Sequence, residues 1–135
     1  GSGRARAAEA VSRLQAEGVR TSLFIDPDSN SVRAAAEIGA DAIELHTGEY
    51  ANSETPHARR DAVQRLADTA DLAAGLGLSV HAGHGLTYEN VTPVAGIGPV
   101  EELNIGHTIV SRAVFTGLER AVREMKEIVL RARGS

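Results

Sequence analysis

Short segments rich in branched side chains alternate with alanine-rich segments along this chain. Four of the short segments are "VRTSLFID" (19–26), "DAIELHTG" (41–48), "LSVHAGHG" (78–85) and "EELNIGHT" (101–108). Each is too short for a typical helix and ends in Gly, Asp or Thr, which is the pattern of a β-strand. The sequence therefore predicts four strands.

Helices are predicted between these strands, because apolar residues recur there at intervals of three and four. The residues that carry this spacing are Val11 and Leu14, then Val32, Ala35, Ala36 and Ile38, then Ala62, Val63, Leu66, Ala70 and Ala73, and finally Leu118, Val122, Met125 and Val129. Gly18, Gly39 and Gly77 are expected just past helix ends in a left-handed conformation. Thr55 with Pro56 predicts a helix start, and Thr116 with Glu119 has the spacing of a capping box.

The repeating order of strand and helix predicts a parallel sheet, since parallel strands need crossover connections. Ser22 with Asp26, Glu44 with His46, and Glu102 with Asn104 each share one face of a strand, so one face of the sheet is polar. Barrel enzymes have such polar inner faces near their carboxyl-terminal rim, but a full (βα)8 barrel takes roughly 250 residues. The predicted fold class is α/β, half of a (βα)8 TIM barrel, with four parallel strands and covering helices.

Length and composition predict one soluble domain. The chain has 135 residues, a hydrophobic share of 42% and a charged share of 24%, which are ordinary values for globular proteins. We assign the domain to residues 4–134 and interpret residues 1–3 and 135 as cloning remnants.

Charge and cysteine content restrict the function classes. The net charge of −4 comes without a basic cluster, so we expect no nucleic-acid partner. The absence of cysteine excludes disulfides and thiolate chemistry and fits a reducing compartment. No stretch approaches the ~20 apolar residues of a membrane span, and no signal peptide opens the chain. We therefore expect a cytoplasmic protein without membrane contact.

His84 is the first candidate for chemistry, because it lies between two glycines at a predicted strand end. An imidazole there suits general acid or base catalysis, although a loop histidine bonded to the backbone would have the same pattern. His81 and His84 start on opposite strand faces, so a zinc site, with His46 and His107 as the further ligands, is disfavoured. We expect no metal.

Two glycines, a second histidine and a glutamate complete the predicted site. Gly85, and Gly106 with His107, each follow a strand and open a helical stretch, where backbone N–H groups can bind an anion; ordinary turn formation is the alternative. Glu44 points inward, so it is either ion-paired to His46 or an arginine, or functional. Asp26 before Pro27 is interpreted as a turn residue.

Four segments together resemble the carboxyl-terminal half of the pyridoxine 5'-phosphate synthase family. They are "SLFID", "AAAEIGADAIELHTGEYA", "LGLSVHAGHGLTYENV" and "ELNIGHTIVSRAVFTGLERAVREMK". The resemblance implies a (βα)8 barrel transferase that needs no metal or other cofactor. Such an enzyme condenses 1-deoxy-D-xylulose 5-phosphate with 3-amino-2-oxopropyl phosphate, and it releases phosphate and water.

The resemblance also implies roles for individual residues. His84 matches the proton donor of the family, Gly85 a substrate contact, and Gly106 and His107 the phosphate contacts, while Glu44 matches a glutamate that assists proton transfer. The family's other catalytic histidine and glutamate, and its arginine and asparagine ligands, belong to the amino-terminal half. We therefore expect phosphorylated small-molecule partners but no complete catalysis by this chain alone.

A half barrel leaves two strand edges and its inner face uncovered, and such edges pair with other chains. We therefore expect self-association, as a two-fold homodimer or a higher homo-oligomer. The alternative hypothesis is an engineered structural half-barrel module that has at most weak phosphate binding and no activity.

Overall fold

A single parallel sheet organises the computed structural model, which describes residues 2–134. Its strands are β1 (Ser22–Ile25), β2 (Ala42–His46), β3 (Ser79–Gly83) and β4 (Val100–Asn104), in the order β1-β2-β3-β4. All neighbouring pairs are parallel, which confirms the four predicted strands and the half-barrel fold class. Each strand is shorter than its predicted segment, and helices begin at Gly48 and His107, within the segments 41–48 and 101–108 that were expected to be strand.

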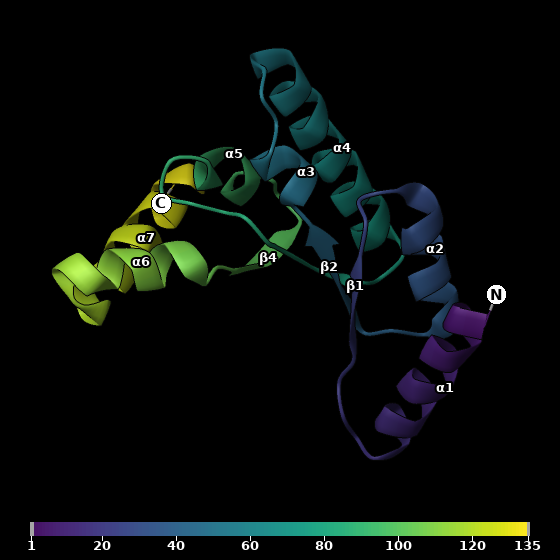
Figure 1. Cartoon of the computed structure of the whole chain (residues 1–135). Helices are drawn as coiled ribbons and strands as arrows, with labels where there is room; N and C mark the ends of the chain where they lie inside the picture. Colours follow the sequence, from purple (N-terminus) through teal and green to yellow (C-terminus); the bar gives the residue numbers. More distant parts are fainter. Residues whose placement is uncertain (1, 135) are drawn as a thin grey trace.

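Helices cover one side of this sheet (Figure 1). They are α1 (Ser2–Ala16), α2 (Ser29–Ile38), α3 (Gly48–Ala51), α4 (Pro56–Gly75), α5 (Val91–Ala95), α6 (His107–Thr116) and α7 (Leu118–Ala132). Residues 2 and 3, which we interpreted as cloning remnants, are the first two residues of α1, while residues 1 and 135 lie outside the described part of the chain. No helix within residues 2–134 has the length and hydrophobicity needed to cross a bilayer.

The hydrophobic core lies between the sheet and its helices. Ile43 and Leu45 of β2 are in register with Val80 and Ala82 of β3, and all four side chains are buried. They belong to one apolar cluster with Val32 of α2, Leu66, Ala70 and Ala73 of α4, and Val91 and Val94 of α5. We call the helix-covered face of the sheet the outer face and the opposite one the inner face. Because alternate residues of a strand point to opposite faces, the apolar residues lie on the outer face and the polar residues on the inner face.

Most of the predicted helix ends are confirmed. Gly39 closes α2 with a φ of 88°, and its N–H group donates to the carbonyls of the last turn. Gly18 and Gly77 also have positive φ, and the Thr55 side chain caps α4 by accepting from the N–H group of Ala58, with Pro56 in the first turn.

The capping box predicted for Thr116 and Glu119 is wrong. Thr116 is the last residue of α6, and its hydroxyl donates to the Arg112 carbonyl of the same helix at 3.2 Å. The position before α7 is taken by Gly117, and no side chain caps that helix.

The apolar stripe predicted for α7 is only partly buried, because Met125 lies in the core whereas Leu118 and Val122 are exposed.

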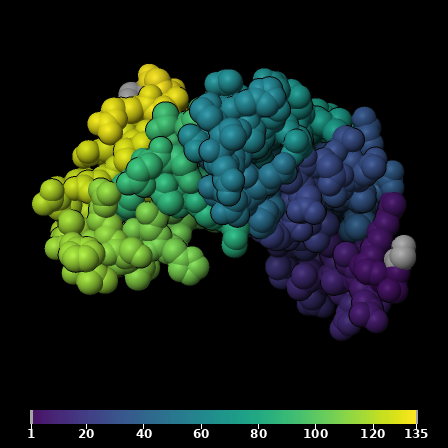
Figure 2. All heavy atoms as spheres, turned by 45° about the horizontal axis from the view of Figure 1, so that its top comes forward, coloured from purple at the N-terminus to yellow at the C-terminus, as the bar shows by residue number. Residues whose placement is uncertain are grey.

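The molecule has the shape of an arch, with α1 at one end and α6 and α7 at the other (Figure 2). The inner face of the sheet lines the hollow of this arch, and it carries Phe24, Glu44, His46, His81 and Asn104. β1 and β4 are the two edge strands. The hollow is therefore bordered by two strand edges that have no partner among residues 2–134.

Candidate functional site

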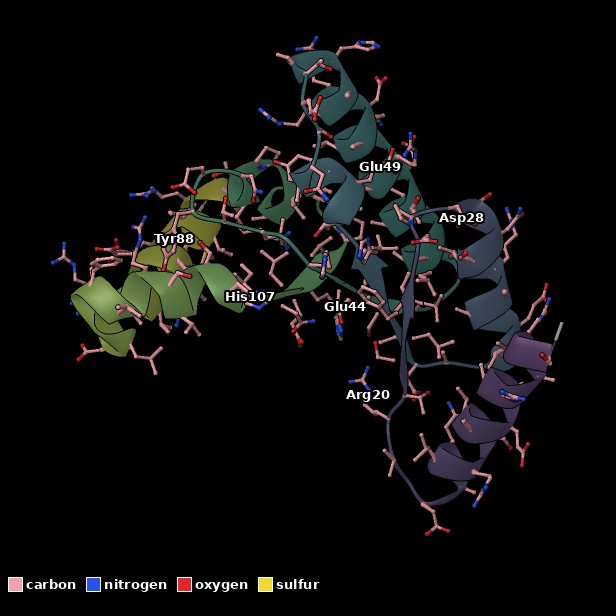
Figure 3. All side chains as sticks on the ribbon, in the orientation of Figure 1. Arg20, Asp28, Glu44, Glu49, Tyr88 and His107 are labelled. Atoms are coloured by element: carbon pink, nitrogen blue, oxygen red, sulfur yellow. The ribbon has the colours of Figure 1, made fainter. Side chains whose placement is uncertain are left out.

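An open cavity lies at the carboxyl ends of the strands, inside the arch. Its volume is ≈730 Å³, and its lining includes all the predicted site residues: Glu44, His84, Gly85, Gly106 and His107. Figure 3 shows Glu44 and His107 on the concave side of the sheet, whereas Asp28, Glu49 and Tyr88 lie on the helical side. Residues that are more than sixty positions apart in the sequence thus meet at one rim.

His84 follows the last residue of β3 and has an unusual backbone conformation. Its φ is 89°, and among residues 2–134 it is the only residue other than glycine with a positive φ. The imidazole is stacked on that of His46, with ring centroids 4.6 Å apart and an angle of 25° between the planes. The carbonyl oxygen of His84 accepts a hydrogen bond from the Thr47 hydroxyl at 2.5 Å. The ring itself is exposed at the cavity.

Glu44 lies in the middle of the inner face, where it is in register with Phe24 of β1 and His81 of β3. Its carboxylate extends over Gly83: a Cβ atom on residue 83 would lie 2.4 Å from Oε1 of Glu44. The ion-paired interpretation of Glu44 is wrong, because no salt bridge within residues 2–134 includes it. The carboxylate is therefore available to a ligand in the cavity.

Gly106 and His107 form the start of α6 at the same cavity. Gly106 is the N-cap residue, and no side chain caps this helix. The first N–H groups of a helix have no partner within the helix, and its dipole makes this end partly positive. These features together can bind an anion.

Gly85 does not open a helix, contrary to the prediction. The helix after it, α5, begins only at Val91. Asn90 holds the intervening turn, since its Oδ1 accepts from the Thr87 N–H group at 2.7 Å and its Nδ2 donates to the Gly85 carbonyl at 3.1 Å. Gly85 has a φ of 77°, and a Cβ atom there would lie 2.7 Å from that of Ala51. Glycine is needed here for the turn.

Several residues around the site were not predicted from the sequence. Thr47, Asn90 and Phe24 contact His84, Gly85 and His46 respectively, but no local spacing pattern marks them. Asp26 does not line the cavity; its carbonyl oxygen accepts from the Asp28 N–H group at 2.8 Å, as a turn residue would.

The two histidines of "HAGH" do not converge. His81 lies within β3 on the inner face, whereas His84 lies beyond the end of the strand. Within residues 2–134, no group of three or more His, Asp and Glu side chains is placed to hold a metal ion.

Comparisons with known proteins agree on a family. The family model described as "Pyridoxal phosphate biosynthesis protein PdxJ" matches residues 2–131. The curated pyridoxine 5'-phosphate synthases of Geobacter sulfurreducens and Geobacter metallireducens are 50% and 48% identical to this chain over 122 residues. Those matches cover 90% of the chain and 51% of each relative, so the chain spans about half the length of the relatives it matches.

A solved structure supports the fold. The crystal structure of the Amycolatopsis orientalis BexX/CysO complex superposes with a TM-score of 0.63 at 24% sequence identity, over 96% of this chain and 49% of that one. At this identity the likeness concerns the fold alone. The family match, by contrast, extends over nearly the whole sequence. This chain therefore belongs to the PdxJ family.

Proposed function

We propose that this chain provides half of the active site of a pyridoxine 5'-phosphate synthase. That transferase condenses 1-deoxy-D-xylulose 5-phosphate with 3-amino-2-oxopropyl phosphate. One observation carries the proposal: in a member of the PdxJ family, Glu44, His84, Gly85, Gly106 and His107 line one cavity at the carboxyl ends of parallel strands. Active sites of α/β barrels lie at this rim.

The start of α6 is proposed to bind a substrate phosphate. The uncapped N-terminus supplies N–H donors and the positive end of the helix dipole, and both favour a dianion. The His107 side chain extends from the same turn into the cavity and can donate a further hydrogen bond. Both substrates of the family reaction carry a phosphate, so such a site has a direct use.

His84 is proposed as the proton donor and Glu44 as its assistant. Loss of water from the condensing substrates requires a proton on the departing hydroxyl, and an imidazole titrates close enough to neutral pH to supply it. Glu44 offers a carboxylate that forms no salt bridge within the described residues, on the strand next to β3. It can therefore accept a proton from a substrate group in the same cavity.

Catalysis by the isolated chain is proposed to be incomplete, because the chain spans about half the length of the relatives it matches. The chain is also proposed to self-associate, and two observations support this association. β1 and β4 each have an unpaired edge, which can template pairing with another chain. The Phe24 side chain is 58% exposed on the inner face, where a partner would cover it. A homodimer would bring two copies of the half site to one rim.

Complementation tests the proposed activity. The chain is mixed with the separately produced amino-terminal half of the Geobacter sulfurreducens relative, and pyridoxine 5'-phosphate formation is measured from both substrates. We expect product from the mixture, none from either half alone, and none when His84→Ala replaces the wild-type chain. His57→Ala is the matched control, because His57 lies on the exposed surface of α4 and pairs with Asp61. Product from the chain alone would contradict the incomplete site.

The competing hypothesis is an engineered structural half-barrel module. It predicts weak phosphate binding and no product even with the amino-terminal half present. Light scattering gives the molar mass in solution, and a phosphate titration followed by the amide signals of Gly106 and His107 measures binding. A compact monomer would rule out the proposed self-association without affecting the phosphate site.

A further inference from the structure

We propose that the segment His46-Thr47-Gly48 is a built support that fixes the position of the His84 imidazole at the rim. His46 and Thr47 are then positioning residues that act through His84 and need not touch substrate. The inference rests on the proposed role of His84 as proton donor, and it explains how that side chain is held in place.

The backbone of His84 requires such a support. A φ of 89° is unfavourable for a residue with a Cβ atom, and it persists only where the surroundings hold it. Gly85 next to it has a φ of 77°, so the chain turns sharply at the end of β3. This turn directs the imidazole of His84 back over β2 and against His46. Without contacts that favour it, the residue would relax to negative φ.

Thr47 supplies the backbone part of the support. Its side chain is fully buried, and its hydroxyl donates to the carbonyl of His84 at 2.5 Å. Its own N–H group donates to the carbonyl of Gly83 at 2.9 Å. Thr47 thus donates to the two carbonyl groups that flank the Cα atom of His84, those of Gly83 and of His84 itself. This arrangement follows from the sheet register, which pairs His46 with Gly83.

His46 supplies the side-chain part. The His46 ring stacks on that of His84. It also makes an edge-to-face contact with the Phe24 ring, whose centroid is 5.1 Å from that of His46. The N–H group of Gly48 donates to Nδ1 of His46 at 3.3 Å. This hydrogen bond orients the His46 ring, whose face packs against the His84 imidazole.

Gly48 completes the support because it cannot carry a side chain here. A Cβ atom on residue 48 would lie 2.3 Å from Cε1 and 3.0 Å from Nδ1 of His46, so any larger residue must displace the ring. Displacing the ring would break both the Gly48 hydrogen bond and the stack on His84. The other titratable groups at the cavity are Glu44 from β2 and His107 from α6, neither of which belongs to this support.

The first experiment uses Thr47→Val, which keeps the branched shape and the backbone N–H group but removes the hydroxyl. In the complemented assembly we expect kcat to fall by about tenfold to a hundredfold, the range for a catalytic group misplaced by about 1 Å, with KM changed by less than about twofold. Thr47→Ser keeps the hydroxyl and should recover most of the loss. Thr69→Val is the matched control: its buried hydroxyl also donates to a carbonyl, that of Arg65 at 2.6 Å, but far from the rim.

The second experiment reads His84 directly and needs no activity. The stacked His46 ring should shield the NMR signals of the His84 ring protons, so His46→Ala should move them toward the values of free histidine. Gly48→Ala should do the same, while Thr69→Val should leave them unchanged. If Thr47→Val does not fold, as judged by circular dichroism, these two variants still decide the matter.

The two possible failures are distinguishable. If the wild-type assembly makes no product but the His84 signals respond to His46→Ala, the proposed function fails and the support remains. If His84 signals are the same in wild type, His46→Ala and Gly48→Ala, the support is overturned. It is also overturned if folded Thr47→Val has the kcat of the wild type.

Discussion

The two faces of the sheet differ in what they need from the rest of the molecule. On the outer face, Ile43, Leu45, Val80 and Ala82 are at most 1% exposed, beneath helices supplied by the chain itself. On the inner face, Phe24 is 58% exposed, and the polar side chains around it border an open cavity. The outer face is covered by helices of this chain, whereas the inner face is open.

In this half barrel the outer face contributes most of the stability, whereas the inner face carries the candidate site. Burial of apolar area is the dominant favourable term in folding, and it is concentrated on the outer face. The inner face contributes the residues of the candidate site, which lie on strand ends and loops held by that core. Substitutions on the two faces should therefore have effects of different kinds, and the following predictions compare them.

The largest expected effect is a loss of stability on the outer face. Leu45 is fully buried, so Leu45→Ala leaves a cavity and should lower the free energy of unfolding by roughly 2–5 kcal/mol. Urea denaturation followed by circular dichroism measures this loss. Leu130→Ala is the control, because Leu130 is 44% exposed on α7 and should lose far less. Equal losses at the two positions would contradict the division between the faces.

The next effect is smaller and falls on the inner face. A Cβ atom at residue 83 would lie 2.4 Å from Glu44 Oε1 and 2.9 Å from the Asn104 carbonyl, so Gly83→Ala should cost about 1–3 kcal/mol through overcrowding. It should also weaken the phosphate-dependent changes in the amide NMR signals of Gly106 and His107. Leu45→Ala should leave these changes as they are when the two variants are compared under conditions where the same fraction of each is folded. Gly98→Ala is the control, because its added methyl would meet nothing within 4 Å.

The sequence predicted the parts of the fold that depend on local signals. The four strands, the turn at Gly39 and the cap at Thr55 all follow from spacing and residue type within a few positions. The convergence of Glu44, His84 and His107 was predictable too, since parallel strands carry their carboxyl ends to the same rim.

The remaining features depend on contacts between distant residues. The bond from Thr47 to His84 joins residues 37 positions apart, and only the register of β2 and β3 brings them together. The positive φ of His84 has no local signal, because that conformation is ordinarily a property of glycine. The Thr116 capping box failed for a related reason: the spacing was present, but α6 extends through Thr116. Helix α6 likewise begins inside the predicted last strand.

A third prediction concerns self-association. Phe24→Lys places a charge on the exposed inner face, so it should change the free energy of unfolding by less than about 1 kcal/mol. If a second copy covers this face, the same substitution should shift the molar mass toward that of the monomer, because burial would cost the ammonium group its hydration. Light scattering at several concentrations measures this. The control Val114→Lys changes an apolar residue on α6 that is even more exposed, at 78%.

The last prediction concerns a helix that covers the outer face. Asp28 caps α2: hydrogen bonds from the N–H group and the hydroxyl of Ser31, both 2.8 Å long, lower the pKa of its carboxyl below the ordinary 3.8. Asp28→Ala should cost about 1 kcal/mol at pH 7. Asp28→Asn keeps an acceptor but removes the charge, so its loss should be only a few tenths of a kcal/mol.

The pH dependence separates the charge from the cap. Because the pKa of Asp28 is lower in the folded chain, its charge stabilises the fold at pH values above the unfolded pKa, and this contribution is lost as the pH falls through the folded pKa. The difference in stability between wild type and Asp28→Asn, measured by urea denaturation, should therefore be present at pH 7 and shrink toward zero below the ordinary value of 3.8. If the stability difference between wild type and Asp28→Asn instead grew on acidification, the charge of Asp28 would not stabilise α2. The helices of the outer face would then owe less of their stability to charged caps than the structure indicates.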